Sequence, residues 1–144
     1  MIDRAVRFIV VFVAMVATVG ASGAAARGDD WLGPCSVVSD PAGQKLYIAQ
    51  ARANSVAVYD IASGKVDDSF SMLDSPTSVA LSPDGKTLYV TCGGARGRVV
   101  AIDLARKMTP KRFRAGYGAQ GAVLSPDGGT LYVCNRFNNS VMAI

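Results

Sequence analysis

Residues Ser82–Val90 read SPDGKTLYV, and Ser125–Val133 repeat the phrase as SPDGGTLYV, with eight of nine residues identical. A more divergent copy, DPAGQKLYI, occupies Asp40–Ile48. The three copies begin 42 and 43 residues apart. An internal repeat of roughly 40–45 residues is typical of four-stranded propeller blades or of helical pairs, so the local pattern must decide between them.

A second phrase keeps the same spacing. It reads NSVAVYD at Asn54–Asp60, GRVVAID at Gly97–Asp103 and NSVMAI at Asn139–Ile144. Two separate phrases in one register indicate a true repeat rather than a chance match.

The local pattern favours strands. In Ser-Pro-Asp-Gly, proline sets φ, aspartate can bond its own backbone and glycine accepts a positive φ, which together favour a tight hairpin turn. The flanking runs are short and β-branched or aromatic, and no ten-residue window free of Gly and Pro has helical periodicity. We therefore predict an all-β propeller of four-stranded antiparallel blades. The strands of the second unit are expected at residues 78–81, 88–91, 99–104 and 111–115.

These phrases resemble a known repeat. The set SPDGxTLYV, followed by an Asn-Ser-Val run and V-x-V-x-D, is similar to the YVTN-type β-propeller repeat of bacterial and archaeal extracytoplasmic proteins. Its signature words here are YIAQ (Tyr47–Gln50), YVTC (Tyr89–Cys92) and YVCN (Tyr132–Asn135), and the resemblance covers Pro34–Ile144. The resemblance implies an extracytoplasmic propeller. Proteins with this type of repeat include binding, lactonase-like and redox-linked proteins, so the fold alone does not decide the function.

The predicted organisation is a signal peptide at 1–26, a linker at 27–33 and a partial propeller at 34–144. About two and a half blades are expected, at 34–75, 76–118 and, incomplete, 119–144. Because propellers typically close with about 4–8 blades, we expect the chain to be the N-terminal part of a longer protein. The alternative is a small protein that closes by self-association.

The N-terminus predicts export. Arg4 and Arg7 precede the apolar run Phe8–Val19, and small residues follow. This order is typical of a secretory signal peptide, which we expect to be helical and to be cleaved after Ala26 or after Gly23. The alternative is an uncleaved anchor, because residues 8–26 carry no charge. The mature protein is expected in the periplasm, outside the cell or at its surface, with no stable transmembrane span.

Composition excludes several chemistries within the chain. There is no His, and all eleven acidic residues are Asp. A His-ligated zinc site, a Ser-His-Asp triad, a Cys-x-x-Cys-His haem attachment site and a Glu general base are therefore excluded. We predict no catalytic, cofactor-binding or metal-binding residue and no cofactor in this chain. Asp84 and Asp127 in the hairpin turns, and Asp60 and Asp103 after the third strands, are interpreted as turn residues rather than calcium ligands.

The candidate binding surface is the rim that holds the loops between the second and third strands of each unit. Loops of a propeller are free to bind because the strands beneath them are used in packing. The candidate residues on these loops are Arg52, Asn54, Arg96, Arg136, Phe137 and Asn138. Guanidinium groups suit carboxylate or phosphate, so the expected partner is an anionic ligand or an envelope protein, and not nucleic acid. The alternative is that the arginines only keep the surface soluble.

Two further features have structural interpretations. The basic stretch Arg106–Arg114 is interpreted as an outer strand whose charges protect a sheet edge, rather than as a site for an anionic envelope surface. Cys35, Cys92 and Cys134 are predicted at the same rim as the loops. Each is expected to be a buried, unreactive thiol, with a Cys35–Cys92 disulfide as the alternative.

The predicted function is that of an exported, non-catalytic scaffold that binds a ligand or a protein. One alternative is the propeller portion of a periplasmic redox enzyme, linked to a c-type cytochrome or to a quinone, or of a lactonase-like enzyme. In that case the catalytic residues lie beyond residue 144, in a further domain of the same protein. Another alternative is a surface-layer or adhesion protein with more propeller repeats.

Overall fold

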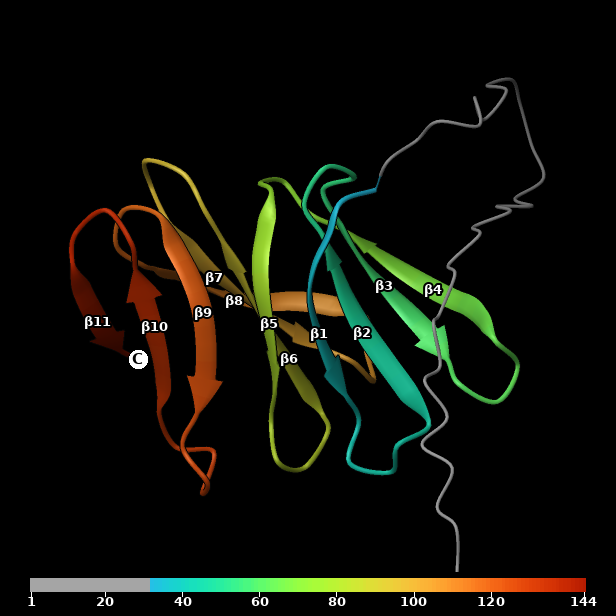
Figure 1. The fold of residues 1–144 in the computed structure, drawn as a ribbon. Helices are drawn as coiled ribbons and strands as arrows, with labels where there is room; N and C mark the ends of the chain where they lie inside the picture. Colours follow the sequence, from blue (N-terminus) through green and yellow to red (C-terminus); the bar gives the residue numbers. More distant parts are fainter. Residues whose placement is uncertain (1–31) are drawn as a thin grey trace, which may run out of the picture.

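The computed structural model describes residues 32–144 of the 144-residue chain. The predicted signal peptide helix at 1–26 and most of the predicted linker lie outside the described residues. The described residues form three antiparallel sheets that stand next to one another like the blades of a fan (Figure 1). Over this part of the chain, no helix is long and apolar enough to cross a membrane.

Each sheet uses its strands in chain order from one edge to the other. The first contains β1 (Pro34–Ser39), β2 (Lys45–Gln50), β3 (Ser55–Asp60) and β4 (Lys65–Ser71). The second contains β5 (Pro76–Leu81), β6 (Thr87–Cys92), β7 (Arg98–Asp103) and β8 (Met108–Arg114). The third contains β9 (Ala119–Leu124), β10 (Leu131–Asn135) and β11 (Ser140–Ala143). The prediction of an all-β fold of four-stranded antiparallel propeller blades is confirmed, although β8 begins three residues earlier than expected.

The Ser-Pro-Asp-Gly phrase forms the predicted tight turn between β5 and β6. The backbone N–H of Gly85 donates to the carbonyl of Ser82 at 2.8 Å, and φ of Gly85 is 70°, in the left-handed region that glycine tolerates. Asp84 Oδ1 accepts hydrogen bonds from the Ser82 hydroxyl at 2.6 Å and from the Lys86 N–H at 3.1 Å. The hydrogen bond from the Ser82 hydroxyl is the main cause that holds the pKa of Asp84 below its usual value, and the bond from the Lys86 N–H adds to it.

Asp60 and Asp103 close the turns after β3 and β7, as predicted. Asp60 Oδ1 accepts the backbone N–H of Ser63 at 2.7 Å, and Asp103 Oδ1 accepts that of Arg106 at 2.9 Å. These carboxylates therefore satisfy backbone donors, as expected of turn residues.

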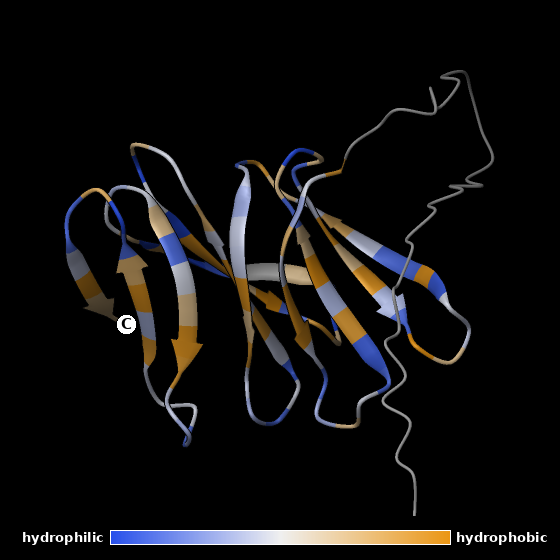
Figure 2. Cartoon of the chain, viewed as in Figure 1, coloured by the Kyte–Doolittle hydropathy of each residue, from blue (hydrophilic) through white to orange (hydrophobic). Residues whose placement is uncertain are grey.

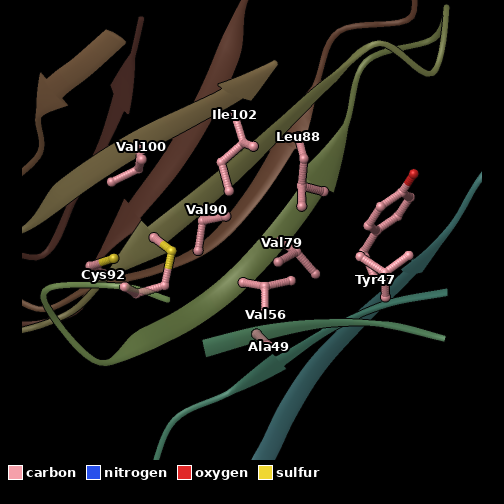
Figure 3. Close-up of a cluster of buried hydrophobic side chains, with 11 residues drawn as sticks. Tyr47, Ala49, Val56, Val79, Leu88, Val90, Cys92, Val100 and Ile102 are labelled. Carbon is pink, nitrogen blue, oxygen red and sulfur yellow. The ribbon is translucent and has the colours of Figure 1, made fainter. Parts of the chain in front are cut away.

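An apolar core lies between the first and second sheets. From the second sheet Leu88, Val90 and Ile102 are fully buried, and they pack against Tyr47 and Val56 of the first sheet (Figure 3). Figure 2 shows apolar and more polar residues alternating along strands such as β2 and β10, as expected where successive side chains point to opposite faces.

The second sheet is apolar on both faces. On the face opposite the first core, Ala80 and Val99 pack with Leu131 and Val133 of the third sheet. This explains why β7 reads as the continuous apolar run VVAI rather than as an alternating pattern.

The outer faces of the first and third sheets remain open. Val37 of β1 is more than half exposed, and so are Val123 of β9 and Val141 of β11. Tyr132 of β10 is also exposed, whereas its counterpart in the second sheet, Tyr89, packs against the third sheet. These two open faces are the faces on which a further sheet of the same kind would pack.

The structure corrects part of the cysteine prediction. All three thiols are free, and Cys92 is buried as expected, but Cys35 and Cys134 are exposed. Cys35 lies on the edge strand β1, where its thiol donates to the carbonyls of Ala49 and Pro76 while the residue stays exposed. Cys134 lies on the open face of β10; the equivalent residue of β6, Thr91, is fully buried because the third sheet covers it. Burial of a thiol at this place therefore depends on a neighbouring sheet.

The core predicts the effect of a cavity at its centre. Replacing Leu88 by Ala is expected to lower the free energy of unfolding by about 2–5 kcal/mol, because the side chain is fully enclosed between two sheets. Urea denaturation followed by circular dichroism measures this. Leu73→Ala is the matched control; Leu73 is 76% exposed, and its loss should change stability by less than about 0.5 kcal/mol. Equal losses in the two variants would contradict this packing.

Candidate functional site

The loops β2–β3 (residues 51–54), β6–β7 (93–97) and β10–β11 (136–139) lie at one rim of the fold, opposite the hairpin turns (Figure 1). The connections between sheets, at residues 72–75 and 115–118, reach the same rim. The rim therefore gathers five segments that do not form the sheets.

An exposed aromatic pair stands at this rim. The ring centroids of Tyr117 and Phe137 are 4.8 Å apart, with the planes tilted by 44°. The guanidinium carbon of Arg136 lies 5.4 Å from the centre of the Phe137 ring, within the range of a cation–π contact. Tyr117 is 47% exposed and Phe137 57% exposed. We call Tyr117, Arg136 and Phe137 the rim cluster.

Hydrogen bonds fix the backbone beneath the rim cluster. Asn135, which is buried, accepts the N–H of Gly116 on Oδ1 at 2.8 Å, and Asn138 accepts the N–H of Tyr117 on Oδ1 at 3.1 Å. The N–H of Phe137 donates to the carbonyl of Tyr117 at 3.2 Å. The two segments that carry the aromatic rings are thus tied together before any partner arrives.

Gly118 is required where the Phe137 ring crosses the connection between the sheets. Its φ is +68°, and a Cβ at this position would lie 2.3 Å from Cδ2 of Phe137. Any side chain here would displace the ring, so the glycine lets the aromatic side chain lie directly against the backbone.

The structure brings three of the six predicted rim residues together: Arg136 and Phe137 belong to the rim cluster, and Asn138 accepts the backbone N–H of Tyr117 beneath it. The other three lie on the two preceding loops. Arg52 lies beside Gly33, since a Cβ on that glycine would be 2.9 Å from the Cγ of Arg52. Asn54 adopts a φ of 48° at the β2–β3 turn, and its carbonyl accepts the N–H of Met72 at 2.7 Å, so its role there is structural. Arg96 is exposed on the β6–β7 loop.

Two residues of the site were missed from the sequence. Tyr117 comes from the connection after β8, and Asn135 ends β10, outside the loop itself. The available signal was the Gly116-Tyr117-Gly118 triplet, in which an aromatic residue is flanked by glycines just before a strand.

The rim cluster contains no carboxylate, imidazole or thiol. Its side chains offer two aromatic faces, one phenol and one guanidinium group. Within residues 32–144, no three His, Cys, Asp or Glu side chains come together in a way that could hold a metal ion. The chemistry of the cluster is therefore stacking, apolar contact and pairing with an anion.

No family model matches the chain. Antigen Lp49 from Leptospira interrogans is 32% identical to it over 93 residues, a segment that covers 56% of this chain and 20% of that protein. A chain of Kuenenia stuttgartiensis hydrazine synthase is 32% identical and superposes with a TM-score of 0.69, covering 74% of this chain and 30% of the other.

Two more distant structures share the fold. A putative 6-phosphogluconolactonase from Bacteroides fragilis has a TM-score of 0.71 at 20% identity, over 78% of this chain and 35% of that one. The β-propeller domain of Cps50 (Swd1) from Myceliophteria thermophila has a TM-score of 0.67 at 20% identity, over 77% and 33%. The described sheets are therefore blades of a β-propeller. The chain spans between 20% and 35% of the length of these relatives.

The hydrogen bonds of the site predict the effect of removing Asn135. Asn135→Ala leaves the N–H of Gly116 without its acceptor, and we expect the free energy of unfolding to fall by about 1–3 kcal/mol. Thermal and urea denaturation measure the change. Asn138→Ala is the control, because Asn138 is exposed and water can replace its oxygen. A loss at residue 138 as large as that at residue 135 would contradict the assignment.

Proposed function

We propose that this chain is the propeller part of an exported YVTN-type repeat protein, and that it serves as a non-catalytic module that binds a partner protein through the rim cluster. The observation that carries the proposal is the half-exposed pair of Tyr117 and Phe137, whose backbone is held by hydrogen bonds that Asn135 and Asn138 accept.

The chemistry of the rim cluster supports a protein partner. Aromatic residues and arginine are enriched at protein interfaces and carry much of their binding energy. Because the two loop segments are already tied together, little conformational freedom remains to be lost on binding. Arg136, with Arg52 and Arg96 on the neighbouring loops, suits a partner with acidic side chains. An anionic small ligand is the other partner that these groups would accept.

The open sheet faces support a larger propeller. Val37 at one end of the fan, and Val123, Tyr132 and Val141 at the other, are exposed apolar residues on faces that are covered wherever a neighbouring sheet is present. The relatives are three to five times as long as the parts they share with this chain. In our proposal further blades of the same repeat cover both faces, and the chain is the N-terminal part of a longer protein.

Export is part of the proposal and has its own test. Expressed in a bacterium, the chain is expected in the periplasmic fraction as a mature form that begins at Arg27 or at Ala24, according to the cleavage site. Mass spectrometry of the intact protein distinguishes these forms. A Val13→Asp variant, which places a charge in the apolar run, should remain in the cytoplasm at full length. If both proteins keep residues 1–26 and stay inside, the export proposal is wrong.

Binding through the rim cluster predicts which variants lose the partner. The partner would be captured by crosslinking in the cells that produce the protein, identified by mass spectrometry and then purified for titration. We expect Phe137→Ala and Tyr117→Ala each to weaken the binary complex by about tenfold or more. Ile61→Ala is the control, since it removes an exposed apolar side chain from the turn after β3, away from both the rim cluster and the open sheet faces. Equal affinity of the three variants would place the interface elsewhere.

A second candidate is the propeller portion of an enzyme. The observation that favours it is the 32% identity to hydrazine synthase over 74% of this chain. Catalytic residues would then lie outside the chain, in the same longer protein, with a c-type haem or a quinone as the redox group. Visible absorption of the native protein purified from its source tests this, because the scaffold proposal requires no chromophore.

A further inference from the structure

A small cavity of about 60 Å³ lies at the junction of the first and second sheets. Its apolar side is formed by Met72, Cys92 and Val100, and its charged side by Asp74, Arg98 and Arg112. Figure 3 shows Cys92 and Val100 at one end of the core between these two sheets. None of these residues belongs to the rim cluster, so an experiment on this site tests a proposal that is independent of the proposed function.

Strand register brings three arginines onto one face of the second sheet. In the pairing of β7 with β8, Arg98 stands opposite Arg114, and Val100 stands opposite Arg112. Directly paired residues share a face, and so do residues two apart along a strand. Val100 packs in the core with the first sheet. Arg98, Arg112 and Arg114 therefore lie on the face that is turned toward the first sheet, at the end of this core.

The positive charge of this face is only partly compensated. Arg98 Nη1 lies 3.5 Å from Asp74 Oδ2, and the Arg98 side chain is 41% exposed. Within the described part of the chain, neither Arg112 nor Arg114 has a carboxylate oxygen within 4 Å. Two guanidinium charges remain in excess, and the pair Arg98–Arg114 sets like charges directly opposite each other, an arrangement that destabilises a sheet.

The thiol beneath these arginines does not supply the missing negative charge. Burial is the main cause that raises the pKa of the Cys92 thiol to about 11, and the Asp74 carboxylate adds to it. At neutral pH the thiol is therefore protonated and neutral. The floor of the cavity is an uncharged surface of sulfur and aliphatic carbon.

The repeat itself shows that a blade does not need arginine at these places. The positions of the first sheet with the same register are Ser55 opposite Ser71, and Ser69 opposite Ala57. Three serines thus stand where the second sheet has Arg98, Arg114 and Arg112. Protection of an edge strand by charge explains basic residues on β8 in general. It does not explain Arg98, which lies on the inner strand β7, nor the gathering of all three on one face.

We propose that Arg98, Arg112 and Arg114 form a binding site for a phosphate monoester or inorganic phosphate at the mouth of this cavity. Guanidinium groups match phosphate oxygens with paired hydrogen bonds. A phosphate monoester carries about −1.5 to −2 charges near pH 7, enough to neutralise most or all of the two positive charges that Asp74 leaves uncompensated. A single carboxylate would neutralise only half of it. The phosphate belongs either to a soluble ligand or to a lipid headgroup.

The test is titration of the full chain with inorganic phosphate, glycerol 3-phosphate and vesicles that contain phosphatidic acid. The test variant is the triple substitution Arg98→Ser, Arg112→Ser and Arg114→Ser, which restores the serines of the first sheet and should therefore fold. The control variant, Lys65→Ser, Arg106→Ser and Lys111→Ser, removes the same charge elsewhere. Circular dichroism verifies that both variants fold. If the triple variant does not fold, the single variant Arg112→Ser replaces it in the titrations.

We expect phosphate to bind the wild-type chain and to raise its melting temperature. Affinity should fall at least about tenfold in the triple variant, as expected where charge-assisted bonds are lost, and change by less than about twofold in the control. Saturable binding of glycerol 3-phosphate with this pattern identifies a soluble ligand, and binding of vesicles alone with the same pattern identifies a lipid headgroup. Equal weakening in both variants, or a wild-type chain that binds none of the three probes, would overturn the proposal.

Discussion

The structure depends on one constraint, which is that the apolar face of a sheet is buried only where another sheet lies against it. On one face of the second sheet, the first sheet buries Leu88, Val90 and Ile102. On the other face, the third sheet buries Val99. Neither core could exist within a single sheet, since its side chains meet their partners only across the space between two sheets. The repeat is the consequence, because the same packing problem recurs at every blade.

This constraint decides where function can be placed. Side chains of the inner strands are occupied in packing, so a blade can vary without loss of stability only at its loops, its connections and its outer strand. Both proposed sites follow this rule. The rim cluster is built from a loop and a connection, and two of the three arginines of the phosphate site come from the outermost strand, β8. The third arginine, Arg98, is the first residue of β7, so it lies at the end of an inner strand and next to a loop.

The candidate site was only half visible in the sequence. Arg136, Phe137 and Asn138 are adjacent in the chain, and their loop could be assigned to the rim from strand polarity alone. Tyr117 was missed because it contacts this loop across 21 residues of sequence. Asn135 directly precedes the loop, and it was missed because the N–H that it accepts belongs to Gly116, 19 residues earlier; no local pattern encodes these contacts. Arg98, Arg112 and Arg114 were visible as basic residues, but their common face followed only from the register of β7 and β8.

The sequence by itself determined the blade, because period, turn chemistry and strand pattern are local properties: Ser-Pro-Asp-Gly makes the same turn wherever it occurs, and Asp60 and Asp103 close theirs in the same way. Only the tertiary structure decided which equivalent residues are buried. Thr91 and Cys134 occupy the same place in successive sheets, yet one is fully covered and the other exposed. The physical reason is that burial here belongs to the contact between two sheets, so it depends on whether a neighbour is present and not on the residue or its strand.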